Sequence, residues 1–196
     1  MEFNDYKKPE IYEKVLSIKE LETLSTFLSK IFKKSLYYQL KNKLSVEFLN
    51  WLYNENPNGR AIINNIYEKE KIIAHFGLVP IKVIFNNKTY KSALTVFTAV
   101  DENHRGLHFL QLGSKSFELA KLMGVRFIIG VANQTSSELY VKCFKFKLIS
   151  QLAVKVGLST FQEENNFQHK FQILRDKKTL KWRLNNPRFK YQIYQK

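Results

Sequence analysis

The sequence contains a single cysteine and no long apolar segment. The lone Cys143 excludes a disulfide framework and any metal site built from several thiolates. No run of roughly 18 apolar residues is present, so no membrane-spanning helix is expected. The first residues also lack the charged and then apolar order of a secretion signal. We therefore expect a cytoplasmic protein.

Acidic side chains are scarce relative to basic ones. The 196 residues include 17 Asp and Glu against 32 Lys and Arg, which gives a net charge of +15. Residues 141–196 carry 13 of the basic and 3 of the acidic side chains. Such a field attracts polyanions, for example a nucleotide cofactor, an acidic carrier protein or a nucleic acid. A lysine-rich surface with no special partner is the alternative interpretation. With 44% hydrophobic and 14% aromatic residues, the chain can bury a core.

Two helices are expected in the first part of the chain. Ser17 and Glu20 have the spacing of a capping box, and apolar residues follow at intervals of three and four as far as Phe32. This pattern predicts a helix packed on a core. A second, shorter helix is predicted to begin at Ser45 and to stop before the Asn-Pro-Asn-Gly sequence at 56–59.

Beyond Ala61 the apolar pattern becomes that of strands and then of a crossover. Strands are predicted at 61–67, 71–84 and 90–100, with connections short enough for hairpins. A polar break at 101–108, a helix at 109–123 and an apolar strand at 125–132, expected to be covered on both faces, come next. The predicted fold is α/β, with a mixed sheet whose antiparallel meander turns parallel around one helical crossover, flanked by helices. Further along we expect a short helix at 135–143, a strand at 146–156, a loop at 161–169 and a last strand at 171–174.

A short pattern occurs twice. Trp51 followed by Asn56-Pro57 returns as Trp182 followed by Asn186-Pro187. The second occurrence is either a coincidence or the start of a second copy of the fold. In the latter case residues 1–158 form one domain and residues 159–196 a basic segment that begins the copy. Such a tail cannot bury its apolar face alone, so it should pack on this domain or on a partner.

The first candidate site lies in the polar break between a strand and a helix. Backbone amides at a helix N-terminus attract anions such as a pyrophosphate, and Arg105 adds a permanent positive charge. An ordinary loop with a surface arginine is the alternative. The second candidate site follows strand 125–132, where Asn133, Ser136 and Tyr140 precede Phe146.

Taken together, these two segments resemble the GNAT-type acyl-CoA N-acyltransferases. In that family a strand ending in Val precedes an Arg-x-x-Gly-x-Gly (or Ala) turn that wraps the pyrophosphate, and an Asn then opens a helix whose Leu-Tyr pair precedes Gly-Phe. The matching residues here are Val100, Arg105-Gly106, Asn133, Leu139-Tyr140 and Phe146. The glycines of the family pattern fall at His108, Leu110 and Lys145. The resemblance spans residues 48–156, and its Trp51…Asn56-Pro57…Gly59 segment looks like a subset of these enzymes linked to surface-sugar modification. Some members of the superfamily carry two tandem copies.

The resemblance implies transfer of an acetyl or other acyl group from a coenzyme A thioester, such as acetyl-CoA, to a primary amine of a small acceptor, for example an amino sugar. Tyr140 would protonate the departing thiolate, and His75 would be the best side-chain base, with Glu102 and His104 as alternatives. A core aromatic at Tyr140 and a hydrogen-bonded structural residue at His75 are the alternative interpretations. The residues that would bind the donor are Thr98, Ala99, Val100, Arg105, Gly106, Leu107, His108, Phe109, Leu110, Asn133 and Ser136.

Several alternatives stay open. The same fold could take its acyl group from acyl carrier protein or aminoacyl-tRNA, or it could be a binding module without catalysis. A homodimer through the C-terminal segment is a further expectation. No metal site is expected, because the pair His104 and His108 has no third ligand nearby. Cys143 has no neighbouring base, so we expect it to be a small buried residue.

Overall fold

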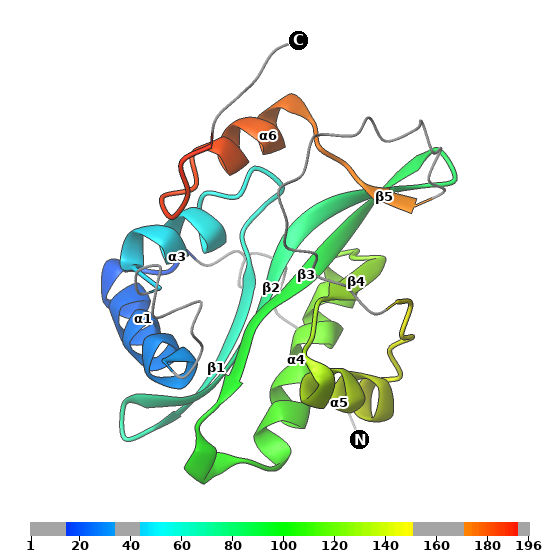
Figure 1. The fold of residues 1–196 in the computed structure, drawn as a ribbon. Helices are drawn as coiled ribbons and strands as arrows, with labels where there is room; N and C mark the ends of the chain where they lie inside the picture. Colours follow the sequence, from blue (N-terminus) through cyan, green and yellow to red (C-terminus); the bar gives the residue numbers. More distant parts are fainter. Residues whose placement is uncertain (1–14, 34–43, 151–170, 192–196) are drawn as a thin grey trace, which may run out of the picture.

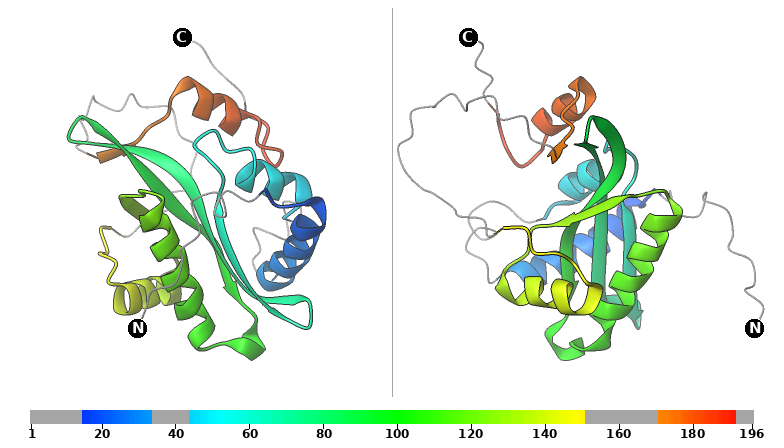
Figure 2. Two further views of the ribbon diagram at one scale, coloured as in Figure 1. Left: turned by 180° about the vertical axis from the view of Figure 1, so that it is seen from behind. Right: turned by 90° about the vertical axis from the view of Figure 1, so that its right-hand side faces the viewer.

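The computed structural model describes residues 15–33, 44–150 and 171–191. In these ranges a sheet carries helices on both faces, with α1 and α3 on one side and α4 and α5 on the other (Figures 1 and 2). None of these helices is both long enough and apolar enough to cross a lipid bilayer. The elements in chain order are α1 (Ile18–Phe32), α3 (Val46–Tyr53), β1 (Ile62–Glu68), β2 (Lys71–Phe85), β3 (Lys88–Val100), the 3-10 turn η2 (Glu102–His104), α4 (Leu107–Leu122), β4 (Phe127–Gly130), α5 (Gln134–Phe144), β5 (Phe171–Ile173) and α6 (Lys177–Leu184).

Both early helices begin where their caps predicted. The Ser17 hydroxyl oxygen accepts a hydrogen bond from the Glu20 amide, and the Glu20 carboxylate accepts one from the Ser17 amide. The Ser45 hydroxyl oxygen accepts one from the Phe48 amide at the start of α3. Each cap satisfies an amide that the helix itself leaves without a partner, so the local sequence fixes where each helix starts.

The antiparallel meander is confirmed. β1 pairs with β2, and β2 pairs with β3, through two tight turns at Lys69-Glu70 and Asn86-Asn87 whose residues all have positive φ. Turns of this conformation match the right-handed twist of the strands they join. The predicted last strand is β5, which pairs antiparallel with the far end of β2.

The parallel crossover is also confirmed, with two differences from the sequence prediction. α4 begins at Leu107, two residues early, because Gly106 adopts a φ of 139° that lets the chain enter the helix abruptly. β4 covers only Phe127–Gly130, and its residues are half-buried or exposed rather than covered on both faces. The reason is its position: in the described part of the chain β4 pairs with β3 alone, at the end of the strand order.

The region after α5 departs from the prediction as well. Residues 146–150 form no strand, and the rest of the predicted strand lies outside the described residues, as does the predicted loop at 161–169. Cys143 is exposed rather than buried, because it lies on the solvent side of α5.

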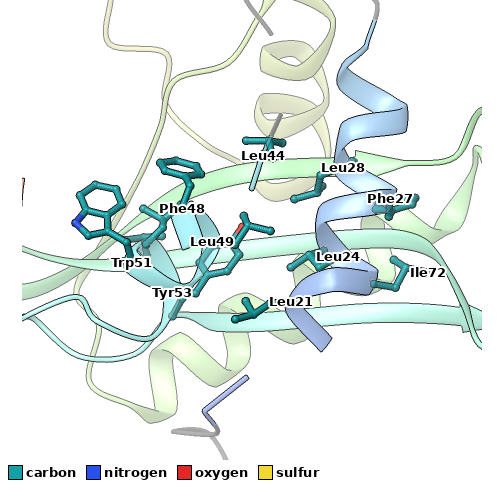
Figure 3. Close-up of a cluster of buried hydrophobic side chains, with 14 residues drawn as sticks. Leu21, Leu24, Phe27, Leu28, Leu44, Phe48, Leu49, Trp51, Tyr53 and Ile72 are labelled. Carbon is teal, nitrogen blue, oxygen red and sulfur yellow. The ribbon is translucent and has the colours of Figure 1, made fainter. Parts of the chain in front are cut away.

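Two hydrophobic clusters hold the helices to the sheet. The cluster under α1 and α3 is drawn in Figure 3, where Leu24 and Phe27 of α1 lie beside Ile72 of β2, and Leu49 of α3 belongs to the same cluster. Leu28 and Leu49 are fully buried in it, and burial of such a side chain contributes about 1.5–3 kcal/mol. The cluster on the other face joins the sheet to α4 and α5 and includes Phe76, Leu112 and Tyr140.

The C-terminal segment packs on this domain, which is one of the two arrangements that the sequence predicted. α6 lies against α3 at the end of the molecule where β5 meets β2 (Figure 1). The aromatic ring of Trp182 stacks on that of Trp51 at a centroid distance of 4.2 Å.

Candidate active site

The two parallel strands pair over only part of their length. Ser92 to Thr95 of β3 pair with Phe127 to Gly130 of β4, where β4 ends. β3 continues for five more residues to Val100, without β4 beside it. Within the described part of the chain, the backbone of β3 from Val96 to Val100 therefore has no strand paired with it on the β4 side.

A β-bulge in β3 directs side chains to opposite faces of the sheet at this point. His75 pairs with Ala99 and Gly77 pairs with Val96, so both Phe97 and Thr98 lie opposite Phe76. Phe97 has a φ of 48°, and its ring packs against Phe32 and Phe48 under α1 and α3. Bulges of this kind bend a strand and reorient its side chains, and here the bulge turns Thr98 towards α5.

Tyr140 meets this bulge from α5. Its hydroxyl lies 3.0 Å from the Thr98 hydroxyl, and the tyrosine is only 6% exposed. The Phe109 ring from the first turn of α4 packs edge-on against the Tyr140 ring, with centroids 5.6 Å apart. Two of the residues predicted for the site, Tyr140 and Thr98, are thus in direct contact, next to the N-terminus of α4.

Burial raises the pKa of the Tyr140 phenol above its ordinary value, and hydrogen bonding to Thr98 and Thr95 opposes the rise in part. A buried phenol with a raised pKa keeps its proton at neutral pH. Tyr140 is therefore available in its protonated form to donate to an anion that forms beside it.

The ends of α5 fit the family pattern in two respects. Asn133 is the N-cap residue, and its side-chain oxygen accepts a hydrogen bond from the Ser136 amide at 2.9 Å. Lys145 ends the helix in the left-handed conformation, with a φ of 57°. Glycine is the usual residue in that conformation, and Lys145 occupies the position of a glycine in the family pattern.

The sequence predicted an anion site at the N-terminus of α4. Its N-cap residue is Gly106, which has no side chain to cap the first amides of the helix. Arg105 and Leu107 are exposed beside it. The His108 Nδ1 atom is buried and has no hydrogen-bond partner within the described part of the chain. Donors of this kind suit an anionic group such as a phosphate.

Asp101 organises the turn between β3 and α4, and sequence reasoning missed it. Its carboxylate accepts hydrogen bonds from Lys30 Nζ at 2.8 Å and from the Asn103 amide at 3.1 Å. These two bonds hold the pKa of Asp101 below its ordinary value, with Lys30 as the larger cause. His104 lies between Asp101 and Glu68, with its Nε2 3.4 Å from the Glu68 carboxylate. An acid directly after a strand was the only local signal, since Lys30 is distant in the sequence.

The structure does not bring His75 to Tyr140, which corrects the expectation that His75 is the base. His75 is fully buried on the sheet face that carries α3, whereas Tyr140 lies on the face that carries α4 and α5. Its Nδ1 donates to Asn65 Oδ1 at 2.7 Å, and its Nε2 accepts from the Tyr53 hydroxyl at 3.2 Å. Burial lowers the pKa of His75 to about 3. A group this weakly basic is a poor proton acceptor at neutral pH.

A cavity of about 320 Å³ lies at the β1 edge of the sheet, away from Tyr140. Its lining includes Tyr53 and Asn65, the two partners of His75, together with Lys115 of α4. None of the residues predicted for the site lines this cavity.

Comparisons with known proteins identify the fold. A scan against protein-family models and a search of curated proteins both find no match. Solved structures do match. An aminoglycoside acetyltransferase from an uncultured soil metagenomic sample is 19% identical with a TM-score of 0.55, and the alignment covers 72% of this chain and 95% of that chain. Glucosamine-6-phosphate N-acetyltransferase from Arabidopsis thaliana is 18% identical with a TM-score of 0.54, covering 74% and 97%. An acetyltransferase from Trypanosoma brucei is 13% identical with a TM-score of 0.55, covering 73% and 97%.

The chain has the fold of the GNAT-type N-acetyltransferases. The predicted class, an α/β fold with a mixed sheet flanked by helices, is confirmed. The alignments reach nearly the full length of the matched proteins, so this chain contains their whole fold. At these identities the likeness concerns the fold, and the activity has to be argued from the site itself.

Proposed function

We propose that this protein is an N-acyltransferase that moves an acetyl or other acyl group from coenzyme A to a primary amine. The observation that carries the proposal is the contact between Tyr140 and Thr98, because it places a proton donor where β3 runs on without β4. The acceptor would be a small amine, for example an amino sugar. Two of the matched proteins are by name enzymes for such molecules, an aminoglycoside and glucosamine-6-phosphate.

The donor would lie along the unpaired part of β3. Amide and carbonyl groups of Thr98, Ala99 and Val100 on the β4 side would hydrogen-bond the amides of the pantetheine arm, as a neighbouring strand would. Its pyrophosphate would sit at the N-terminus of α4, over Arg105, Gly106 and the first helical amides. His108, which replaces a glycine of the family pattern, would offer its buried Nδ1 atom to the same group. Asn133 would lie across from β3 at the start of α5.

The reaction would be direct attack of the amine nitrogen on the thioester carbonyl carbon. A carbon–nitrogen bond forms, the carbon–sulfur bond breaks, and the thiolate takes a proton from the Tyr140 hydroxyl. A thiol has a reference pKa of about 8.5, below that of a buried phenol, so Tyr140 is protonated when the thiolate leaves. The attacking nitrogen loses its proton to water or to a side-chain base, for which His104 and Glu102 in η2 are the candidates. Holding amine and thioester together contributes most of the rate.

The test combines donor binding with acyl transfer. Acetyl-CoA should raise the thermal midpoint of the protein, by the equivalent of about 2.7 kcal/mol at one hundred times its dissociation constant. Tyr140→Phe should keep this shift and lower kcat by about 10²-fold or more, measured with a panel of amines that includes aminoglycosides and glucosamine-6-phosphate. Lys121→Ala, at an exposed position near the other end of α4, is the control and should change neither quantity.

Two results would redirect the proposal. A missing shift at millimolar acetyl-CoA, together with activity on acyl carrier protein or aminoacyl-tRNA that falls steeply with salt, would assign the donor to a polyanionic macromolecule. A missing shift with no transfer from any of the three donors would leave a binding module on the same fold.

A further inference from the structure

Residues 176–189 repeat the local structure of residues 45–59. Each segment begins with a side-chain cap, since the Ser45 hydroxyl accepts from the Phe48 amide and the Asp176 carboxylate accepts from the Thr179 amide. Each cap starts a helix of 8 residues, α3 in the first segment and α6 in the second. The tryptophan is the sixth residue of both helices.

The turns that follow the two helices are the same as well. The Asn56 side-chain oxygen accepts from the Asn58 amide at 2.9 Å, and the Asn186 oxygen accepts from the Arg188 amide at 2.9 Å. The next amide along the chain then donates to the carbonyl of the asparagine, at 3.1 Å in the first turn and 3.2 Å in the second. We name each of these segments, helix and turn together, a helix–turn unit.

The two helix–turn units contact each other with twofold symmetry. The Trp51 and Trp182 rings stack with an interplanar angle of 9°. The Trp51 Nε1 donates to the Trp182 carbonyl at 2.9 Å, and the Trp182 Nε1 donates to the Trp51 carbonyl at 3.0 Å. In an isologous contact, residue i of one unit meets residue j of the other and j meets i, and these reciprocal bonds fulfil that condition.

A second pair of contacts obeys the same symmetry. Asn58 of the first turn reaches Thr179 of α6, with 3.5 Å between Nδ2 and Oγ1. Arg188 of the second turn lies over the Phe48 ring of α3, 4.8 Å from its centroid. Asn58 and Arg188 hold equivalent positions in the two turns, and Phe48 and Thr179 are both the third residue of their helices. The symmetry is therefore not confined to the two tryptophans.

We propose that residues 176–189 are a second copy of the unit at 45–59, and that this helix–turn unit is a self-complementary docking element which pairs one fold of this kind with another. The partner it fits is a copy of the same unit, because a tryptophan at the same helical position stacks on the first ring and returns the one indole hydrogen bond that it receives. The contact lies on the sheet face that carries α1 and α3, because Phe48 packs on Phe97 there, whereas Tyr140 meets Thr98 on the face that carries α4 and α5. A second fold joined there would dock on the face opposite Tyr140.

The first test gives the contact a second arginine–ring pair, at the position related by the twofold symmetry to Arg188 and Phe48. The double variant Asn58→Arg, Thr179→Phe should create a second arginine–ring contact, the symmetry mate of Arg188 over Phe48. Urea unfolding of the parent, both single variants and the double variant measures the coupling between the two sites. The folding equilibrium constant of the double variant should be about 2- to 5-fold larger than the value expected from adding the free-energy effects of the two single variants. The control, Asn58→Arg with Lys178→Phe, puts the ring one residue out of register and should show additivity. If Asn58→Arg couples equally to Thr179→Phe and to Lys178→Phe, or couples to neither, the twofold symmetry of the contact is refuted.

The second test examines docking between molecules. Trp182→Asp places a charge in the contact and should release α6 from α3. The uncovered unit at 45–59 should then pair with the same unit of a second chain, giving a dimer whose fraction rises with concentration in sedimentation experiments. Adding Trp51→Phe, which removes both symmetric hydrogen bonds, should weaken that dimer. Tyr191→Asp, at an exposed position outside the contact, should leave the protein as it was. A natively folded Trp182→Asp chain that stays monomeric at all concentrations would refute the docking role, and if this variant unfolds, the coupling measurement decides.

Discussion

The burial of His75 between the sheet and α3 should make the unfolding free energy of the protein fall in acid. The imidazole is fully buried, and both of its nitrogens are engaged by neutral partners, Asn65 and Tyr53. Neither partner carries a negative charge that would offset a positive charge on the buried ring. The pKa of His75 is lowered to about 3 from the ordinary 6.5, with desolvation by burial as the cause.

The sign and size of the effect follow from proton linkage. Below pH 6.5 the unfolded chain binds a proton at His75, whereas in the folded protein this ring stays unprotonated until the pH falls to about 3. Stability from this residue is therefore complete above pH 6.5 and is lost as the pH falls towards 3. Between those limits each pH unit costs about 1.4 kcal/mol, so at pH 4.5 the loss is roughly 2.7 kcal/mol.

The assay is urea unfolding of the parent and of His75→Gln across a pH series. Glutamine can keep a donor and an acceptor in the same place but does not titrate, so the difference between the two unfolding free energies isolates His75. Carboxylates such as Asp101 lose their stabilising effect in acid in both proteins and cancel. We expect the difference to fall by about 1.4 kcal/mol per unit from pH 6 to pH 4. A difference that stays constant over this range would refute the argument that His75 is buried as a neutral ring.

Two further substitutions test the positioning of Tyr140. Lys145→Gly should raise the unfolding free energy by about 0.5–1 kcal/mol, because glycine adopts the left-handed conformation without strain; the control Lys142→Gly, inside α5, should lower it by about 1 kcal/mol in the same assay. Gly113→Ala should lower the unfolding free energy by about 1–3 kcal/mol and also reduce kcat, because a Cβ atom there would overlap the Phe144 ring and displace α5. Helix propensity alone would make Gly113→Ala stabilising by about 1 kcal/mol, so a stabilised variant with parental activity would contradict this packing argument.

The features that sequence reasoning identified correctly depend on neighbouring residues. The capping box at Ser17 and Glu20 closes within one helical turn, and the Asn86-Asn87 turn joins two strands through two residues. The mixed α/β class followed from the order of such local elements, and the GNAT-type fold was implied by the resemblance of the two motif segments to that family. The structural comparisons confirm the fold. The likeness between residues 45–59 and 176–189 was also visible as a repeated Trp and Asn-Pro pattern.

The features that were wrong or missed depend on contacts between distant segments. Whether His75 acts as a base or as a buried structural residue depends on its partners Tyr53 and Asn65, which come from α3 and β1. The strand after α4 is short and partly exposed because of its place in the sheet, although its composition is that of a buried strand. Asp101 gains its importance from Lys30, which only folding brings to 2.8 Å.

The sequence alone determined the caps, the turns, the order of helices and strands as far as α5, and the short helix that carries Leu139 and Tyr140. The tertiary structure alone decided that Tyr140 meets Thr98 at the bulge of β3, and that Trp51 and Trp182 exchange hydrogen bonds. The physical reason is the range of the interactions. Backbone conformation and capping are governed by residues a few positions apart, whereas burial, pKa and the contacts of a site depend on which surfaces the packed core brings together.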